Sequence, residues 1–263
     1  MRNMIGCIIQ ARMGSTRLPG KVLKKIENDN TVIDYVLKQM SFCKKIDKII
    51  VATTTLDEDD KIFYHIKNKV NVFRGSSEDV LDRYFRCASE NKFSVIVRIT
   101  ADNPLIDPEI VDLIVKIFEE KKCDFATNTI FRTFPYGTEV EVFTYKILKE
   151  SWQKAEKPSE REHVTPYMRN PENKFNLENI EYSENFSLLR YTIDRQEDFE
   201  TVKEIIKNIH SRPILLRHII QLNKLKPEIF KINKKIKHDG YISALSKDEQ
   251  FLKLKKGEDN ETN

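Results

Sequence analysis

The sequence of 263 residues lacks the long apolar segment that a membrane span requires. Its hydrophobic runs all fall well short of the roughly 18 residues that cross a bilayer. The N-terminal apolar stretch is interrupted by Gln10 and Arg12 before a signal-peptide core is complete. We therefore expect a cytoplasmic protein with no membrane partner.

Cysteine and glycine are also scarce. The four cysteines form no CxxC pair, which excludes a disulfide framework or a zinc site and favours buried free thiols. The chain has seven glycines and contains neither an internal repeat nor a Ser/Gly/Pro-rich linker. These absences favour one large domain over two separate ones.

The charge is nearly balanced, with 45 Lys+Arg against 41 Asp+Glu and a net charge of +4. Such a balance fits a nucleic acid, an anionic substrate or a lysine-rich surface equally well. The many lysines of residues 217–256 alternate with aliphatic rather than aromatic residues. Since nucleic-acid sites combine concentrated basic residues with stacking aromatics, we expect solvated helix surfaces here and no nucleic-acid partner.

Short β-type runs alternate with amphipathic helical patterns up to residue 127, which predicts βαβ units. The expected strands are 4–10, 48–53, 70–73, 94–99 and 124–127, and the expected helices are 32–42, 57–67, 77–91 and 108–121. The pattern predicts an α/β fold of three layers, Rossmann-like, with a mostly parallel sheet. Asp107 and Pro108 predict the capped start of the fourth helix.

The second half of the chain has a mixed pattern that predicts a small β–α insertion. Strands are expected over 139–144, 174–180 and 188–193, and helices over 146–154, 160–167 and 197–210. We expect one domain over 1–255, with a regular α/β half (1–127), a mixed region (128–212) and a C-terminal helical segment (213–255). Residues 256–263 read as a flexible polar tail.

The most informative stretch is QARMGSTRLPGK (10–21), which leaves the first expected strand at its C-terminal end. It contains two of the seven glycines and interleaves Arg12, Arg17 and Lys21. Glycines let the backbone approach a ligand, and the cationic side chains neutralise phosphate charge. The stretch therefore predicts a polyphosphate-binding loop, whereas a merely charged surface turn is the alternative. It is not a GxxxxGK[ST] loop, because Val22 follows the lysine.

With this loop spelled IIQARMGSTRLPGKVL, the chain resembles the cytidylyltransferases that make CMP-activated sugars, and most of all the spore coat polysaccharide biosynthesis (SpsF) group. The resemblance extends over most of the chain, through the segments 72–84, 97–112, 136–143, 161–171, 188–200 and 238–245. Two segments depart from the group. Ala101-Asp102-Asn103-Pro104 replaces Gly-Asp-Cys-Pro, and Thr138-Glu139-Val140-Glu141 replaces Leu-Asp-Val-Glu.

The resemblance implies a nucleotidyltransferase fold, CTP as nucleotide substrate, and a homodimer that contacts its partner through residues 128–182. It makes 1–127 the nucleotide-binding half and 128–212 the acceptor-binding and dimerisation region. It implies that Arg12 and Lys21 hold the phosphates, that Arg17 supports them, and that the backbone near Ala11 borders the base. Other nucleotide-binding residues implied by it are Gly14, Ser15, Arg74, Gly75 and Thr100. Arg74 and Gly75 open a helix, so a plain helix cap is the alternative for them.

Two aspartates follow expected strands at their C-terminal ends. These are Asp102, after 94–99, and Asp194, after 188–193. A triphosphate arrives with Mg²⁺, which takes oxygen ligands and usually one or two protein carboxylates. The pair therefore predicts a magnesium site, and the resemblance assigns metal binding to both positions. Each aspartate is alternatively a helix N-cap.

The acceptor side of the cleft is expected in residues 128–145 and around two further positions. Glu139 and Glu141 are expected on one strand face, because side chains two residues apart point the same way. The expected acceptor-binding residues are Arg132, Tyr136, Glu139, Glu141, His163 and Arg190. A solvated strand face is the alternative for the two glutamates, and a core or surface histidine is the alternative for His163.

These features predict a Mg²⁺-dependent cytidylyltransferase that transfers CMP from CTP to a sugar or sugar acid and releases pyrophosphate. Arg12, Lys21 and Asp102 are the expected catalytic residues, acting by alignment and charge stabilisation rather than through a protein nucleophile. Two alternatives stay open. One is transfer to a phosphorylated or phosphonate acceptor, and the other is a catalytically silent nucleotide-binding module.

Overall fold

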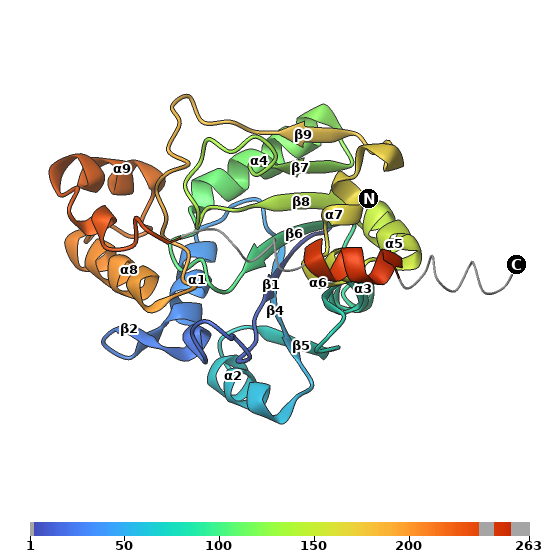
Figure 1. Ribbon diagram of the computed structural model, residues 1–263, viewed down its shortest axis with the longest axis horizontal. Coiled ribbons are helices and arrows are strands. Elements are labelled where there is room, and N and C mark those ends of the chain that lie inside the picture. The colour runs from blue at the N-terminus through green and yellow to red at the C-terminus, as the bar shows by residue number, and fades with distance from the viewer. Residues whose placement is uncertain (1–2, 237–244, 254–263) are drawn as a thin grey trace, which may run out of the picture.

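The computed structural model describes residues 3–236 and 245–253. Its centre is a seven-stranded sheet (Figure 1) with the order β5-β4-β1-β6-β8-β7-β9. Its strands are β1 (Ile5–Gln10), β4 (Lys48–Thr54), β5 (Asn71–Gly75), β6 (Val95–Thr100), β7 (Phe125–Thr127), β8 (Glu141–Thr144) and β9 (Leu177–Asn179). β8 pairs antiparallel with β6 and with β7, while the other pairings are parallel. The mostly parallel sheet expected from the sequence is thus confirmed.

Helices cover both faces of this sheet and give the three layers. One apolar cluster joins a face of β1 and β6 to α1 (Val32–Met40), α2 (Asp60–Ile66) and α4 (Pro108–Lys121). A second cluster joins the opposite face to α3 (Val80–Glu90), α5 (Tyr145–Lys154) and α7 (Pro166–Arg169). Short helix α6 (Pro158–His163) contacts α3. Successive side chains of a strand point to opposite faces, and those of the central strands are nearly all apolar. Both faces of the sheet are therefore buried under helices.

A third apolar cluster lies beside the sheet and joins the loop after β1 to helices of the C-terminal half. It unites Leu18 and Ile26 with α8 (Gln196–Asn208), α9 (Leu216–Leu225) and the short helix η4 (Ile229–Lys231). Figure 1 shows α8 next to the hairpin of β2 (Lys25–Glu27) and β3 (Asn30–Thr31), with α9 on the other side of α8. Three further 3₁₀ turns are η1 (Lys21–Leu23), η2 (Asp57–Asp59) and η3 (Pro171–Asn173). This packing fixes the loop after β1 against the C-terminal half of the chain.

Several local expectations are confirmed, and two are wrong. The helix over 108–121 has the expected bounds, with Asp107 accepting from the amide of Glu109 and proline at its first position. The expected strand 188–193 is not a strand, because this segment pairs with the sheet region only through an isolated bridge between Tyr136 and Arg190. The expected helix 160–167 is divided at Val164, whose φ of 71° interrupts the helical backbone.

The hairpin β2–β3 was not expected from the sequence. Its strands have three and two residues, too few to show the alternation of apolar and polar residues that predicts a strand. Residues 245–253 form a helix, which agrees with the helical C-terminal segment. The expected tail 256–263 and most of the segment 238–245 lie outside the described residues.

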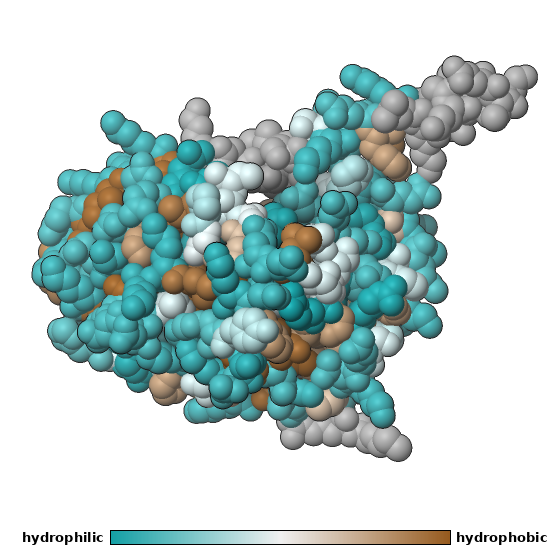
Figure 2. Space-filling model, turned by 90° about the horizontal axis from the view of Figure 1, so that it is seen from below, coloured by the Kyte–Doolittle hydropathy of each residue, from teal (hydrophilic) through white to brown (hydrophobic). Residues whose placement is uncertain are grey.

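The surface seen from below in Figure 2 is largely hydrophilic, and its apolar residues form small separate groups. Within residues 3–236 and 245–253, no helix combines the length and the apolar character that crossing a bilayer demands.

Candidate active site

The loop after β1 is anchored to the neighbouring strand by a buried carboxylate. Asp59 accepts a hydrogen bond from the amide of Met13 at 2.6 Å and another from the hydroxyl of Thr54. The loop then closes on itself, since the amides of Ser15 and Gly20 both donate to the carbonyl of Met13. Gly20 has φ of 65°, a left-handed conformation that glycine adopts without strain. The loop's conformation is therefore fixed by its own hydrogen bonds.

Lys21 lies between the two aspartates that the sequence singles out. Its Nζ donates to Asp102 Oδ2 at 2.7 Å, to Asp194 Oδ1 at 2.9 Å and to the carbonyl of Ile193 at 2.7 Å. The amide of Ile193 donates in turn to the carbonyl of Asp102 at 2.8 Å, which joins the two carboxylate segments. Neither aspartate caps a helix, because Asp107 caps α4 and Arg195 is the N-cap residue of α8. Two carboxylates thus share one cation at the carboxyl edge of the sheet.

Asp194 is held by three cations. Besides Lys21, it pairs with Arg17 Nη2 at 2.8 Å and with Arg190 Nη2 at 2.8 Å. Arg190 is fixed from behind by Asp198, which is fully buried and accepts from Arg190 Nε at 2.8 Å. Asp198 also accepts from the amides of Asp194 and Arg195. The orientation of Asp194 is therefore set by a chain of charged groups rather than by its backbone alone.

The protonation states follow from these contacts. Burial alone would lower the pKa of Lys21, but Asp102 and Asp194 raise it above its ordinary value. Burial would raise the pKa of Asp194, but the charge and hydrogen bond of Lys21, with Arg17 and Arg190, hold it well below its ordinary value. Burial, followed by the charge of Arg98, lowers the pKa of His163. At neutral pH the cleft therefore holds charged Lys21 and Asp194 and a neutral histidine.

These residues line an open cleft of about 990 Å³. Among the described residues, six cationic side chains and four carboxylates face it. Thirteen of the expected site residues line it: Ala11, Arg12, Gly14, Ser15, Arg17, Lys21, Thr100, Asp102, Tyr136, Glu139, His163, Arg190 and Asp194. The excess of positive charge suits a triphosphate.

Arg12 is an exposed cation of the loop. It lines the cleft, and within the described chain no hydrogen bond or ion pair is formed by its guanidinium group. The amides of Gly14 and Thr16 likewise donate to no acceptor among the described residues. These groups can bind an anion without first breaking an intramolecular contact.

Four expected residues do not line this cleft: Arg74, Gly75, Glu141 and Arg132. Arg74 donates from Nε to the carbonyl of Thr54 at 2.9 Å and pairs with Asp60 at 2.6 Å, which directs it over η2 and α2. Gly75, beside it, also lies outside the lining. Glu141 is 5% exposed and is held by Arg98 at 2.5 Å and by the hydroxyl of Thr165 at 2.8 Å. Glu141 therefore orients Arg98 and does not face the cleft.

Glu139 and Glu141 do not share a strand face, because β8 begins only at Glu141. Glu139 instead lies at the cleft, where it accepts from Arg132 Nη1 at 2.7 Å, Asn103 Nδ2 at 3.0 Å and the amide of Gly137 at 2.9 Å. Gly137 has φ of 111°, and an added Cβ would lie 2.6 Å from Tyr191 Cδ2. This turn therefore accepts no side chain at position 137.

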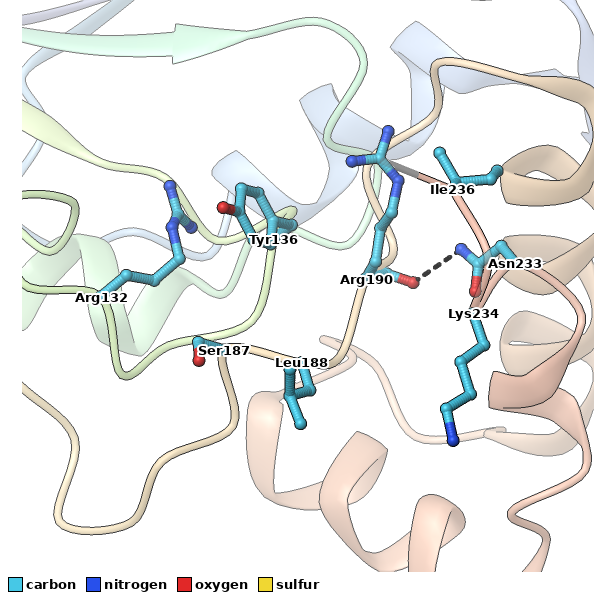
Figure 3. A pocket seen from close by; sticks show the side chains of 8 residues that line it. All are labelled: Arg132, Tyr136, Ser187, Leu188, Arg190, Asn233, Lys234 and Ile236. Atoms are coloured by element: carbon cyan, nitrogen blue, oxygen red, sulfur yellow. Dashed lines mark hydrogen bonds between the residues drawn. The ribbon is translucent and has the colours of Figure 1, made fainter. Parts of the chain in front are cut away.

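A second pocket of about 440 Å³ adjoins the cleft (Figure 3), and Tyr136 and Arg190 line both. Figure 3 shows Arg132 beside Tyr136 on one side, Asn233 and Lys234 on the other, and Arg190 between them. Arg132 stacks on the ring of Tyr136 at 3.9 Å from its centroid. Asn233 Nδ2 donates to the carbonyl of Arg190 at 3.1 Å. Arg132 thus reaches this second pocket rather than the main cleft.

Sequence reasoning missed five residues that build the site: Gln10, Asp59, Arg83, Arg98 and Asn103. Arg83 is 1% exposed although it lines the cleft. A charged residue in an amphipathic helix pattern is ordinarily expected on the solvent-exposed face. The one feature of the sequence that indicates burial of Arg83 is its position among the apolar residues of α3. Asn103 was noted as a departure from the family pattern, and its link to Glu139 emerges only in three dimensions.

A basic, glycine-containing loop after the first strand of a three-layer α/β fold, with two carboxylates beside it, fits the nucleotidyltransferase class. The chain belongs to the cytidylyltransferase family, whose model matches residues 6–236, and it is a CTP-dependent nucleotidyltransferase. It is 38% identical over 219 residues to the spore coat polysaccharide biosynthesis protein SpsF of Bacillus subtilis, covering 80% of this chain and 90% of that protein.

Two solved structures are similar to this one. A cytidylyltransferase from Leptospira borgpetersenii has a TM-score of 0.85 and 38% identity, with 90% of this chain and all of that chain covered. A CMP:2-keto-3-deoxy-manno-octonic acid synthetase complexed with CTP has a TM-score of 0.60 and 17% identity, with 78% of this chain and 98% of that chain covered. The second likeness shows the fold alone.

Proposed function

We propose that this enzyme transfers CMP from CTP to a sugar or sugar-acid hydroxyl, with Mg²⁺ held by Asp102 and Asp194, and that pyrophosphate leaves. The observation that carries the proposal is the convergence of both carboxylates on Lys21 Nζ beside the loop. The name of the SpsF relative supports an acceptor used in polysaccharide assembly.

The residues present fit a magnesium ion. Asp102 and Asp194 come from distant segments, yet both bond the same positive group, so together they can ligate one cation. Mg²⁺ usually takes one or two carboxylates and completes its shell with phosphate and water oxygens. When bound, it would neutralise phosphate charge and lower the pKa of an acceptor hydroxyl.

The chain's own groups supply binding and alignment. Arg12 and the amides of Gly14 and Thr16 face the cleft ready to hold phosphate oxygens. Lys21 supplies positive charge at the point where the α-phosphate meets the acceptor. Alignment and fixed charge at the reacting phosphorus are the main sources of rate in phosphoryl and nucleotidyl transfer.

The acceptor side is formed by Tyr136, Glu139 and Arg190. Glu139 is oriented by three hydrogen bonds and presents an acceptor for sugar hydroxyls. The adjoining pocket carries Arg132, Arg190 and Lys234. Both arginines are paired with carboxylates, so Lys234 supplies the charge that favours an anionic acceptor. This favours a sugar acid, and it keeps a phosphorylated or phosphonate acceptor as the second candidate.

The test is pyrophosphate release from CTP with a panel of neutral, carboxylated and phosphorylated sugars. We expect turnover with one acceptor class and nearly complete loss in Lys21→Ala and in Asp102→Ala. Lys25→Ala is the matched control, because Lys25 is exposed, pairs with Asp29 and lies outside the cleft. Tight CTP binding without turnover on any acceptor would indicate a silent nucleotide-binding module instead.

A further inference from the structure

The helix formed by residues 245–253 lies beyond the part of the chain that the family model matches, yet it borders the cleft. Ser246, on this helix, lines the cleft together with Glu162 and His163 of α6. Figure 1 shows the helix, in red, beside α6. A segment outside residues 6–236 therefore forms part of the wall of the candidate active site.

A buried carboxylate fastens this helix to the start of α6. Asp248 is 8% exposed, and it accepts from the amide of Ser159 at 2.8 Å and from the hydroxyl of Ser159 at 2.5 Å. The amide lies in the first turn of α6, where backbone N–H groups have no acceptor within the helix. Because a buried N–H and a buried carboxylate both require a partner, this contact fixes the position of the C-terminal helix on α6.

The residue before this anchor brings a positive charge to the cleft wall. Lys247 Nζ pairs with Glu162 at 3.1 Å, and the two side chains are 56% and 32% exposed. Glu162 lies in the last turn of α6 and is one of the four carboxylates that face the cleft, whereas Lys247 does not line it. The anchored helix thus places a cation on a carboxylate of the cleft from outside the cleft.

Glu162 is a charged neighbour of the phosphate loop. Burial would raise the pKa of Glu162, but the hydrogen bond of Lys247 leads the causes that lower it below its ordinary value, and the charge of Arg12 is among them. Arg161, the cation next to Glu162 in the sequence, is held by Asp79 at 3.0 Å. Glu162 is therefore ionised at neutral pH, and the loss of Lys247 would direct it towards Arg12.

An ion pair between Glu162 and Arg12 would oppose nucleotide binding in two ways. It would occupy the guanidinium group that we expect to hold phosphate oxygens. It would also keep an unneutralised carboxylate beside the triphosphate, and like charges repel. The contact with Lys247 prevents both effects, because it holds the carboxylate and offsets its charge.

We propose that Lys247 is a positioning residue for nucleotide binding, which holds Glu162 and so keeps Arg12 available to the triphosphate of CTP. This inference rests on the proposed use of CTP. Since Lys247 lies outside the residues that the family model matches, the affinity of this enzyme for its nucleotide depends in part on its own C-terminal helix.

The test is the Kd of CTP in the presence of Mg²⁺, measured by isothermal titration calorimetry at low ionic strength, so that no acceptor is needed. We expect Lys247→Met to raise the Kd about three- to fivefold, the size of effect that a partly exposed ion pair supports. The ratio of the two Kd values should decrease at high salt, which screens exposed charges. An unchanged Kd in Lys247→Met at low ionic strength overturns the proposal.

Three further variants separate charge from structure. Adding Glu162→Gln to Lys247→Met should restore the native Kd or a lower one, because no carboxylate is left to engage Arg12. Lys247→Arg keeps the positive charge and should keep the native Kd. Lys253→Met is the matched control, because Lys253 is exposed on the same helix and does not line the cleft. An increase in Kd that Glu162→Gln does not reverse, or an equal increase in Lys253→Met, counts against the proposal.

The outcomes also separate this inference from the proposed function. If the native enzyme does not bind CTP, both fail together. If it binds CTP and Lys247→Met binds CTP equally well, the role of Lys247 fails alone.

Discussion

Replacing Lys21 with methionine removes the one positive charge that Asp102 and Asp194 share. The side chain keeps its length but loses hydrogen bonds of 2.7, 2.9 and 2.7 Å. Removing one partner of a buried ion pair costs about 3–5 kcal/mol, because the remaining charge stays buried. Asp194 retains Arg17 and Arg190, and the carboxylates are 24% and 20% exposed, so the lower end of that range applies.

We therefore expect a loss of about 3 kcal/mol in the free energy of unfolding. For a domain of this size this corresponds to a decrease of roughly 6–12 °C in Tm. Thermal unfolding followed by circular dichroism, without nucleotide, measures it directly. Lys25→Met serves as the control, since its exposed pair with Asp29 contributes little.

The effect of Mg²⁺ on the Tm of Lys21→Met is a second measurement on the same variant. With the lysine gone, the two carboxylates retain their negative charge and can bind a divalent cation without displacing an ammonium group. Added Mg²⁺ should raise the Tm of Lys21→Met more than that of the native enzyme, and Asp102→Asn should abolish this gain. A Tm of Lys21→Met equal to the native value without Mg²⁺, or a gain with Mg²⁺ no larger than that of the native enzyme, would refute the shared-cation reasoning.

Three other perturbations test separate parts of the site. Gly137→Ala should cost about 2–3 kcal/mol by urea denaturation, because its Cβ would meet Tyr191 and backbone at a φ of 111°, whereas Gly20→Ala meets only a flexible side-chain end and should cost less. His163 has a pKa lowered chiefly by burial, so the unfolded chain takes up its proton more readily below about pH 6.5. The native enzyme should therefore lose more stability between pH 7 and pH 5 than His163→Asn does, and equal losses contradict the assignment. Asp59→Ala should raise the KM for CTP by releasing the loop after β1, with little change in the secondary structure by circular dichroism.

The regular first half of the fold was predictable because strand and helix periods differ clearly there. The strand over 5–10 and the helix over 108–121 fall within a residue of expectation, since each is long and bounded by strong end signals. The segment 188–193 has the same composition as a strand, but its neighbour is a turn rather than a strand. Whether a segment pairs as a strand depends on its neighbours in the tertiary structure, and the sequence of the segment alone does not show them.

The candidate site was predictable where a residue's position at the end of an extended segment places it in the cleft. It was not predictable where the orientation of the side chain decides. Asp102 and Asp194 come together because both follow extended segments at the carboxyl edge of the sheet. Arg74 and Glu141 have suitable chemistry, yet carbonyl groups and Arg98 draw them away from the cleft. Arg83 reaches the cleft because a buried helix face carries it there. Side-chain direction within a folded layer is not encoded in residue type.

The contacts of Lys21 also bear on the order of folding. Its partners Asp102 and Asp194 lie 81 and 173 residues further along the chain, and Leu18 packs in the same apolar cluster as Phe230. Contacts of such sequence separation cannot form until the intervening chain has been made, and non-local contacts form slowly. During synthesis, the sheet of the first half can assemble while the loop after β1 still lacks its counter-charges and its apolar support. A nascent chain therefore has its nucleotide cleft completed only after the C-terminal helices have docked.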